Sequence, residues 1–119
     1  MNFLYDRTGK AVAHIQRDVI YSISGRALAF LKSTNVYSYR GRQLGTLQYG
    51  WLRDLNGYCV CFMRGCNGGG PVTPVTHVDP VVGVLHVAPV QPVPQVPRVS
   101  AVPKLSWSSI SATSFFGQG

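Results

Sequence analysis

The side chains that could do acid–base or nucleophilic chemistry are few and scattered along the 119 residues. The three histidines, His14, His77 and His86, lie in no recognisable catalytic motif. Asp6 and Asp54 occupy a position that holds serine in related parts of the chain, which indicates a hydrogen-bonding role at a turn rather than a carboxylate pair. Catalysis requires an acid, base or nucleophile held beside a partner. We therefore expect no catalytic residue and no enzymatic activity.

The three cysteines raise the question of a metal site. Cys59, Cys61 and Cys66 supply three ligands, whereas tetrahedral zinc takes four, usually as two closely spaced pairs. Cys59 and Cys61 stand where the related units have Ala, Gln or Gly, so small buried residues explain them better. An odd number of cysteines also argues against a disulfide framework and suits a reducing compartment. We expect no metal and no cofactor.

A basic residue follows a glycine at three equivalent points of the chain, and this position is the best candidate for binding. Lys10, Arg26 and Arg42 occupy it, and Tyr58 occupies its fourth copy. A four-fold closure of the chain would gather these side chains around one rim that could bind phosphate, nucleic acid or an acidic protein surface. The alternative is solvated charge that keeps exposed hairpin tips soluble.

The element that carries these positions is a sixteen-residue repeat. Its glycines are Gly9, Gly25, Gly41 and Gly57, and its four units begin, without insertion, at Phe3, Val19, Asn35 and Trp51. In each unit, about five strand-like residues precede a two-residue turn that ends in Gly, and five or six more follow. This is the pattern of a β-hairpin with a type I′ turn. We therefore predict an all-β fold in which residues 1–66 form four hairpins with pseudo-fourfold symmetry.

The second strands of the units alternate small and large residues. The small column is Ala13, Ala29, Gly45 and Cys61, and the large one is Ile15, Leu31, Leu47 and Met63. This alternation fits hairpins that converge on a crowded central axis. The opposite face carries Val12, Leu28, Leu44 and Val60 and is also apolar, so the strands need a second cover. That cover must be the tail, another subunit or a partner, and the small size of the domain favours self-association.

The second half of the chain has a period of three. After a Gly-rich joint at residues 67–70, valine occurs at every third position of residues 71–104: Val72, Val75, Val78, Val81, Val84, Val87, Val90, Val93, Val96, Val99 and Val102. Proline occupies the other two frames, and a period of three matches polyproline II. We predict an extended rod whose valines form one straight apolar ridge of about 95 Å. The alternative is a low-complexity linker whose period arose by duplication.

The last segment, residues 105–119, is polar with spaced large apolar residues. These are Leu105, Trp107, Ile110, Phe115 and Phe116. Large anchors separated by serines are typical of a docking peptide. We therefore expect this segment to dock against another surface, with another protein as one candidate partner.

Taken together, these features resemble the bacterial four-fold β-flower family. The resemblance rests on four hairpins with a Tyr-Asp/Ser-x-x-Gly-Lys/Arg pattern, the Gly-rich joint, the Pro-rich tail and the terminal Leu-Ser-Trp-Ser-Ser segment, and it covers essentially the whole chain. It implies a fold and no activity.

The patterns favour a non-enzymatic assembly protein. On this hypothesis the head and the valine-ridged tail self-associate into a larger homo-oligomer or filament, and deletion of residues 71–119 abolishes assembly but leaves the head folded. The alternative is a binding module that uses the basic turn residues for nucleic acid, another polyanion or a protein partner. An inhibitor of a toxin is a third class, for which the residues give no signature.

The sequence also gives an expectation for the cell compartment. The first residues lack the pattern of a classical signal peptide, and no apolar run approaches the ~20 residues of a membrane span. We expect a cytoplasmic protein. Export by a route that needs no cleaved signal is the alternative.

Overall fold

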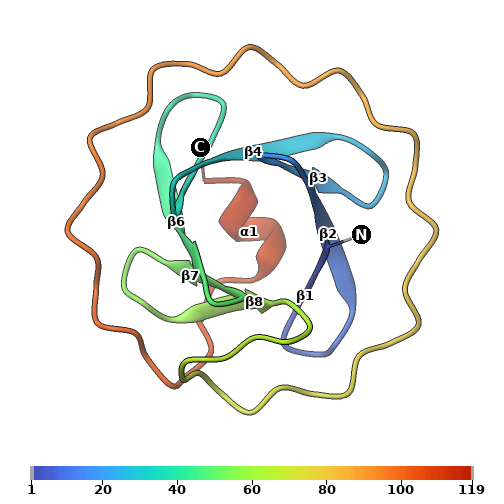
Figure 1. Ribbon diagram of the computed structural model, residues 1–119, viewed down its shortest axis with the longest axis vertical. Coiled ribbons are helices and arrows are strands. Elements are labelled where there is room, and N and C mark those ends of the chain that lie inside the picture. The colour runs from blue at the N-terminus through green and yellow to red at the C-terminus, as the bar shows by residue number, and fades with distance from the viewer. Residues whose placement is uncertain (1, 119) are drawn as a thin grey trace.

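The computed structural model describes residues 2–118, which form eight strands and one short helix (Figure 1). The strands are β1 (Asn2–Tyr5), β2 (Ala11–Gln16), β3 (Val19–Ser22), β4 (Ala27–Lys32), β5 (Asn35–Tyr37), β6 (Gln43–Gln48), β7 (Trp51–Asp54) and β8 (Cys59–Phe62), and the helix is α1 (Ala112–Phe116). Each strand pairs antiparallel with the next, and β1 pairs with β8 to close a barrel. The all-β prediction of four repeated hairpins is confirmed.

The loops at the repeated glycines are one residue longer than the sequence suggested. The Asp6 N–H donates to the Lys10 carbonyl and the Gly9 N–H donates to the Asp6 carbonyl, which leaves a three-residue loop. The Asp6 carboxylate accepts the N–H groups of Thr8 and Lys10. The predicted type I′ turn is wrong, because that turn needs positive φ at two consecutive residues and Thr8 does not have it. Gly9 has φ 88°, which suits the left-handed end of such a loop. Two-residue turns instead join the units, as at Arg17 (φ 57°) between the paired residues Gln16 and Val19.

A register shift in each hairpin explains why both faces of the second strands are apolar. Leu4 pairs with Ala13 and Tyr5 with Ala11, so that Val12 is left over as a bulge. The equivalent residues Leu28, Leu44 and Val60 lie at the same shift in the other hairpins, and all four pack against one core. The apparent second face is thus part of the barrel interior.

Helix α1 supplies the remaining cover by closing one mouth of the barrel, where Figure 1 shows it at the centre of the ring of strands. Phe115 is fully buried and packs in the same core as Leu4 and Ile20. A Cβ on Gly45 would overlap the Arg53 carbonyl and would also lie 3.2 Å from the Phe115 ring, so a small residue is required here by the neighbouring strand and by this ring. The crowded axis inferred from the alternation of small and large residues is therefore occupied by the chain's own C-terminal helix.

Residues 71–104 contain no helix or strand and run around the outside of the barrel as a ring (Figure 1). The molecule measures 36 × 36 × 21 Å, so the predicted straight rod of about 95 Å is wrong. The physical reason is that the tail's backbone is hydrogen-bonded to all four hairpins, which bend it around the barrel. The polyproline II conformation within the ring stays a prediction.

Candidate functional site

The valine frame lies on the outside of the ring. All eleven valines expose between 72% and 97% of their surface, and Leu105, which continues the frame, exposes 70%. We call these residues the valine rim: Val72, Val75, Val78, Val81, Val84, Val87, Val90, Val93, Val96, Val99 and Val102. A row of exposed large apolar side chains of this kind is a candidate interaction surface.

The valines point outward because another frame of the tail is held against the barrel. The N–H groups of His77, His86, Gln95 and Lys104 donate to the carbonyls of Gly9, Gly25, Gly41 and Gly57. Nine tail residues thus span the distance covered by one sixteen-residue hairpin. Nine is a multiple of the three-residue valine period. The four residues bonded to the hairpins therefore fall in one frame, and the valines, which occupy another frame, stay exposed.

The bonds to the hairpins also explain which positions of this docking frame are not proline. Of the seven non-proline residues in the frame that runs from Pro71 to Lys104, all but Ala101 donate their backbone N–H to a hairpin; these donors are His77, Gly83, His86, Gln95, Arg98 and Lys104. Proline has no N–H and could not hold these positions. His77 and His86 therefore act here through their backbones. Their spacing of nine residues, continued at Gln95 and Lys104, was the sequence signal of this register.

The repeated glycines are needed for the tail as well as for their loops. A Cβ on Gly25 would overlap the Val84 carbonyl, and one on Gly41 would lie 2.7 Å from the Val93 carbonyl oxygen. The positive φ at each turn also disfavours a side chain. A glycine is therefore required every sixteen residues for two reasons, the positive φ of the loop and the close approach of the tail.

Arg53 closes the ring where the tail begins and ends. Its Nη1 donates to the carbonyls of Gly57 and Lys104, both at 2.8 Å, and its Nη2 donates to the Gly69 carbonyl at 2.6 Å. Arg53 is 8% exposed and lies over the Trp51 ring. The other three units have tyrosine at this position, so the sequence contained a signal for a special role.

The C-terminal segment docks on its own barrel. Trp107 forms an isolated bridge with Cys59 and packs against Trp51, while the Ser108 hydroxyl donates to the buried Asp54 carboxylate at 2.6 Å. Of the five expected anchors, Phe115 is fully buried, Trp107, Ile110 and Phe116 are partly buried, and Leu105 is exposed. The segment thus docks, and the surface on which it docks belongs to the same chain. A chain lacking residues 71–119 would lose Phe115 from the barrel core, so the truncated head should not stay folded.

The basic turn residues lie on separate hairpins. Lys10, Arg26 and Arg42 are exposed, and Tyr58 is 37% exposed. The Arg42 guanidinium donates to the Gln118 carbonyl at 3.0 Å, and Arg26 lines a hollow beside α1. The structure places these side chains in the loops of four different hairpins around the barrel.

Two residues whose side chains could take part in acid–base or nucleophilic chemistry, His14 and Cys61, are buried in the barrel. His14 is fully buried between Phe3 and Tyr21, and burial lowers the pKa of its imidazole. Burial likewise raises the pKa of the Cys61 thiol. Within residues 2–118, no three His, Cys, Asp or Glu side chains come together as a metal site. In the same part of the chain, no helix has the length and apolar character to cross a membrane.

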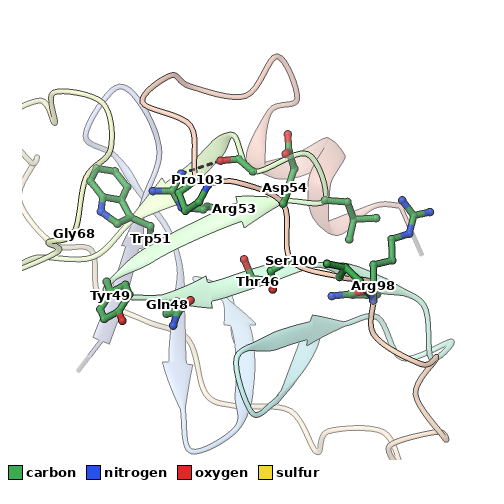
Figure 2. Close-up of a pocket in the computed structure, with 15 residues that line it drawn as sticks. Thr46, Gln48, Tyr49, Trp51, Arg53, Asp54, Gly68, Arg98, Ser100 and Pro103 are labelled. Carbon is green, nitrogen blue, oxygen red and sulfur yellow. Dashed lines mark hydrogen bonds between the residues drawn. The ribbon is translucent and has the colours of Figure 1, made fainter.

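A pocket of about 300 Å³ lies between the outer side of β6 and β7 and the tail residues near Arg98. Figure 2 shows Thr46 and Gln48 from the strand, Arg98 and Ser100 from the tail, and Arg53 among the lining residues. Its place in the repeat is the junction between the third and fourth hairpins. Thr46 departs from the aromatic or histidine residue at this position in the other units, a signal that the sequence prediction missed.

Comparison with known proteins gives one positive finding. No curated protein and no solved structure matches the chain. The model of a protein family described as "4-fold beta flower protein" matches residues 2–116, which include the barrel, the encircling tail and helix α1. The chain therefore belongs to the four-fold β-flower family.

Proposed function

We propose that this protein is a non-enzymatic structural module that assembles with copies of itself through the valine rim. The observation that carries the proposal is the exposure of all eleven valines of the frame, at 72% or more, around the perimeter of the molecule. Burial of apolar surface is the main favourable term in protein association. Each valine removed from water contributes to that term, at roughly 25 cal/mol per Å² buried.

A second copy is the partner that fits this rim best. The barrel interior and the strands are already covered by α1 and the C-terminal segment, so the apolar surface left in solvent is concentrated on the tail. A rim that repeats every three residues can pair with the same rim of another copy across a two-fold axis. Because it runs around the molecule, it offers contacts on several sides and supports arrays larger than a dimer.

The test is to make the rim polar while its backbone preferences are kept. Threonine is β-branched like valine, so Val78→Thr, Val87→Thr and Val96→Thr together retain the stiffness of the tail but add hydroxyl groups. We expect the wild type to form oligomers that grow with concentration in sedimentation velocity and that are visible by negative-stain microscopy, and the triple variant to remain a monomer of unchanged melting temperature.

A matched control changes exposed tail residues outside the frame. Thr73→Asn together with Ser100→Asn should associate as the wild type does, because both residues are exposed and neither belongs to the rim. A wild type that stays monomeric at high concentration, or a triple valine variant that assembles as the wild type does, would remove self-assembly as the function.

An alternative function is supported by the exposed cations at three hairpin tips. Lys10, Arg26 and Arg42 are solvent-exposed, and the chain has a formal net charge of +7. A polyanion such as nucleic acid would bind these residues with a steep dependence on salt, because phosphate contacts release counterions. Electrophoretic mobility with duplex DNA at low salt tests this function. Retardation that is unchanged in the Arg26→Glu, Arg42→Glu variant would assign the binding to other residues.

A further inference from the structure

The four junctions between neighbouring hairpins are equivalent in the repeat, but one of them lacks the pair of rings found at the other three. At each junction a residue of the second strand faces a residue of the following strand. His14 pairs with Tyr21, Phe30 with Tyr37, and Phe62 with Tyr5. Their ring centroids are 5.7, 5.6 and 5.5 Å apart, and all six residues are at least 92% buried.

The remaining junction pairs Thr46 with Arg53. Thr46 has no ring and stays partly exposed, whereas its three counterparts are 3% exposed or less. The pocket of about 300 Å³ lies here, between this pair and the tail (Figure 2). The pocket thus includes the position where the fold elsewhere places an aromatic or imidazole ring.

The size of the pocket admits a ring with a substituent. A cavity of about 150 Å³ is enough to hold a benzene molecule. Twice that volume leaves room for one ring and a small charged group. Arg53 also lines the pocket, and its guanidinium is fixed in place by three backbone carbonyls and the Trp51 ring. A planar guanidinium is a surface on which aromatic rings stack.

The charge of the lining selects the sign of that group. Among residues 2–118 the ion pair formed is Arg64 with Asp79, so neither Arg53 nor Arg98 has a carboxylate partner there. Asp54 also lines the pocket, but its carboxylate accepts the N–H groups of Asn56 and Tyr58 and the Ser108 hydroxyl. Arg98 is exposed and only its backbone N–H is bonded in this part of the chain, to Gln43.

We propose that the Thr46–Arg53 junction is a binding site for a small aromatic anion, a single ring that carries a carboxylate or a phosphate. The ring occupies the place of the missing side chain against Arg53, and the anionic group is held by Arg98 at the mouth. The hydroxyl of Ser100 and the amide of Gln48 line the same space and supply hydrogen bonds to ring substituents. This site adjoins the valine rim proposed for assembly, because Val99 belongs to the rim and also lines the pocket.

The test is calorimetric titration of the full chain with benzoate and with phenyl phosphate. The two probes distinguish a carboxylate from a phosphate source of the charge. We expect at least one of them to bind with a Kd below about 1 mM. Inorganic phosphate, which lacks the ring, and benzyl alcohol, which lacks the charge, should each bind at least tenfold more weakly. Equal binding of either of these two would overturn the assignment, as would the failure of both aromatic anions to bind.

The repeat itself supplies the matched variants. Thr46→Phe restores the residue found in the second and fourth hairpins and should abolish binding by filling the pocket, whereas Thr46→Val keeps the pocket open and should retain it. Arg98→Gln changes an exposed residue, leaves the fold intact and should weaken binding at least fivefold. Undiminished binding by the Arg98→Gln variant, or by a folded Thr46→Phe variant, would contradict the proposal.

Discussion

The barrel and the tail are fixed in place by different kinds of contact. The barrel has a core of buried side chains from every strand, including Leu4, Ile20, Val36 and Leu52 at 0% exposure. The valines of the tail remain in water, and the tail is positioned by its backbone N–H groups on the hairpin carbonyls. The stability of the barrel therefore depends on side-chain volume, whereas the course of the tail depends on which residues can donate an N–H group.

Removal of the C-terminal segment should cause the largest loss of stability among these tests. A chain that ends at residue 104 lacks Phe115, which is fully buried, and the Ser108 partner of Asp54. Loss of a buried Phe side chain alone costs about 3–5 kcal/mol, which is comparable with the whole stability of a small domain. We expect the truncated protein to lose the cooperative thermal transition seen by circular dichroism.

Two point variants separate the buried anchor from the exposed one in the same segment. Phe115→Ala should lower the free energy of unfolding by about 3–5 kcal/mol. Leu105→Ala changes a residue that is 70% exposed and should shift it by less than about 0.5 kcal/mol. If the two variants have equal effects in urea unfolding, the segment does not act by filling the barrel.

The contact between barrel and tail is tested at a turn glycine. Gly25 has φ 97°, and a Cβ there would overlap the Val84 carbonyl. Gly65 has φ 78° with nothing within 4 Å of its Cβ position. We expect Gly65→Ala to cost about 1 kcal/mol from backbone strain alone, and Gly25→Ala to cost about 2–4 kcal/mol because the tail must also move. Equal losses in denaturant unfolding would mean that the tail does not press on the turn.

These cases show what the sequence could and could not predict. The hairpins were predictable because a glycine and its flanking apolar residues recur every sixteen positions, and each copy supports the others. The ring was not, because the bonds that repeat along it join backbone N–H groups to backbone carbonyls, and the side-chain bonds, such as that of Arg64 with Asp79, follow no period in the sequence. The trace that exists is indirect: His77 and His86 interrupt a frame that otherwise favours proline, nine residues apart.

The candidate sites divide in the same way. The valine frame was visible as a period of three, but its outward direction depends on the docking frame beside it. The pocket could have been found from two departures in otherwise regular columns, Thr46 among aromatic or histidine residues and Arg53 among tyrosines. A departure from a repeat shows where symmetry is broken, although the volume left there depends on how the tail passes over it.

His14 tests the side-chain packing of the barrel through pH. It is fully buried, and neither ring nitrogen has a hydrogen-bond partner among residues 2–118. Burial lowers the pKa of His14 from its ordinary value of 6.5, so the unfolded chain binds a proton more readily than the folded one. The stability of the protein is therefore complete above pH 6.5 and falls as the pH drops from 6.5 toward the lowered pKa of the folded state.

The variant His14→Phe should remove this part of the pH dependence. Phenylalanine is the residue of the second and fourth hairpins at this position, so the ring fits the same packing. We expect a gain of about 1–2 kcal/mol at pH 7, since an unpartnered buried polar group is removed, and a larger gain at pH 5. A melting temperature with the same dependence on pH in both proteins would exclude His14 as the group that titrates.

The smallest expected effect comes from a single bond between tail and barrel. His86→Pro keeps an extended backbone but removes the N–H that donates to the Gly25 carbonyl at 2.9 Å. One such hydrogen bond contributes about 1 kcal/mol, so global stability should change by about that amount. Amide exchange should rise locally in the residues near position 86.

Ala101→Pro is the control, because Ala101 is the non-proline residue of this frame that donates no N–H to the hairpins within residues 2–118. If exchange near position 86 is equally slow in both variants, the tail is held by its side chains, and the nine-residue register would not be its cause.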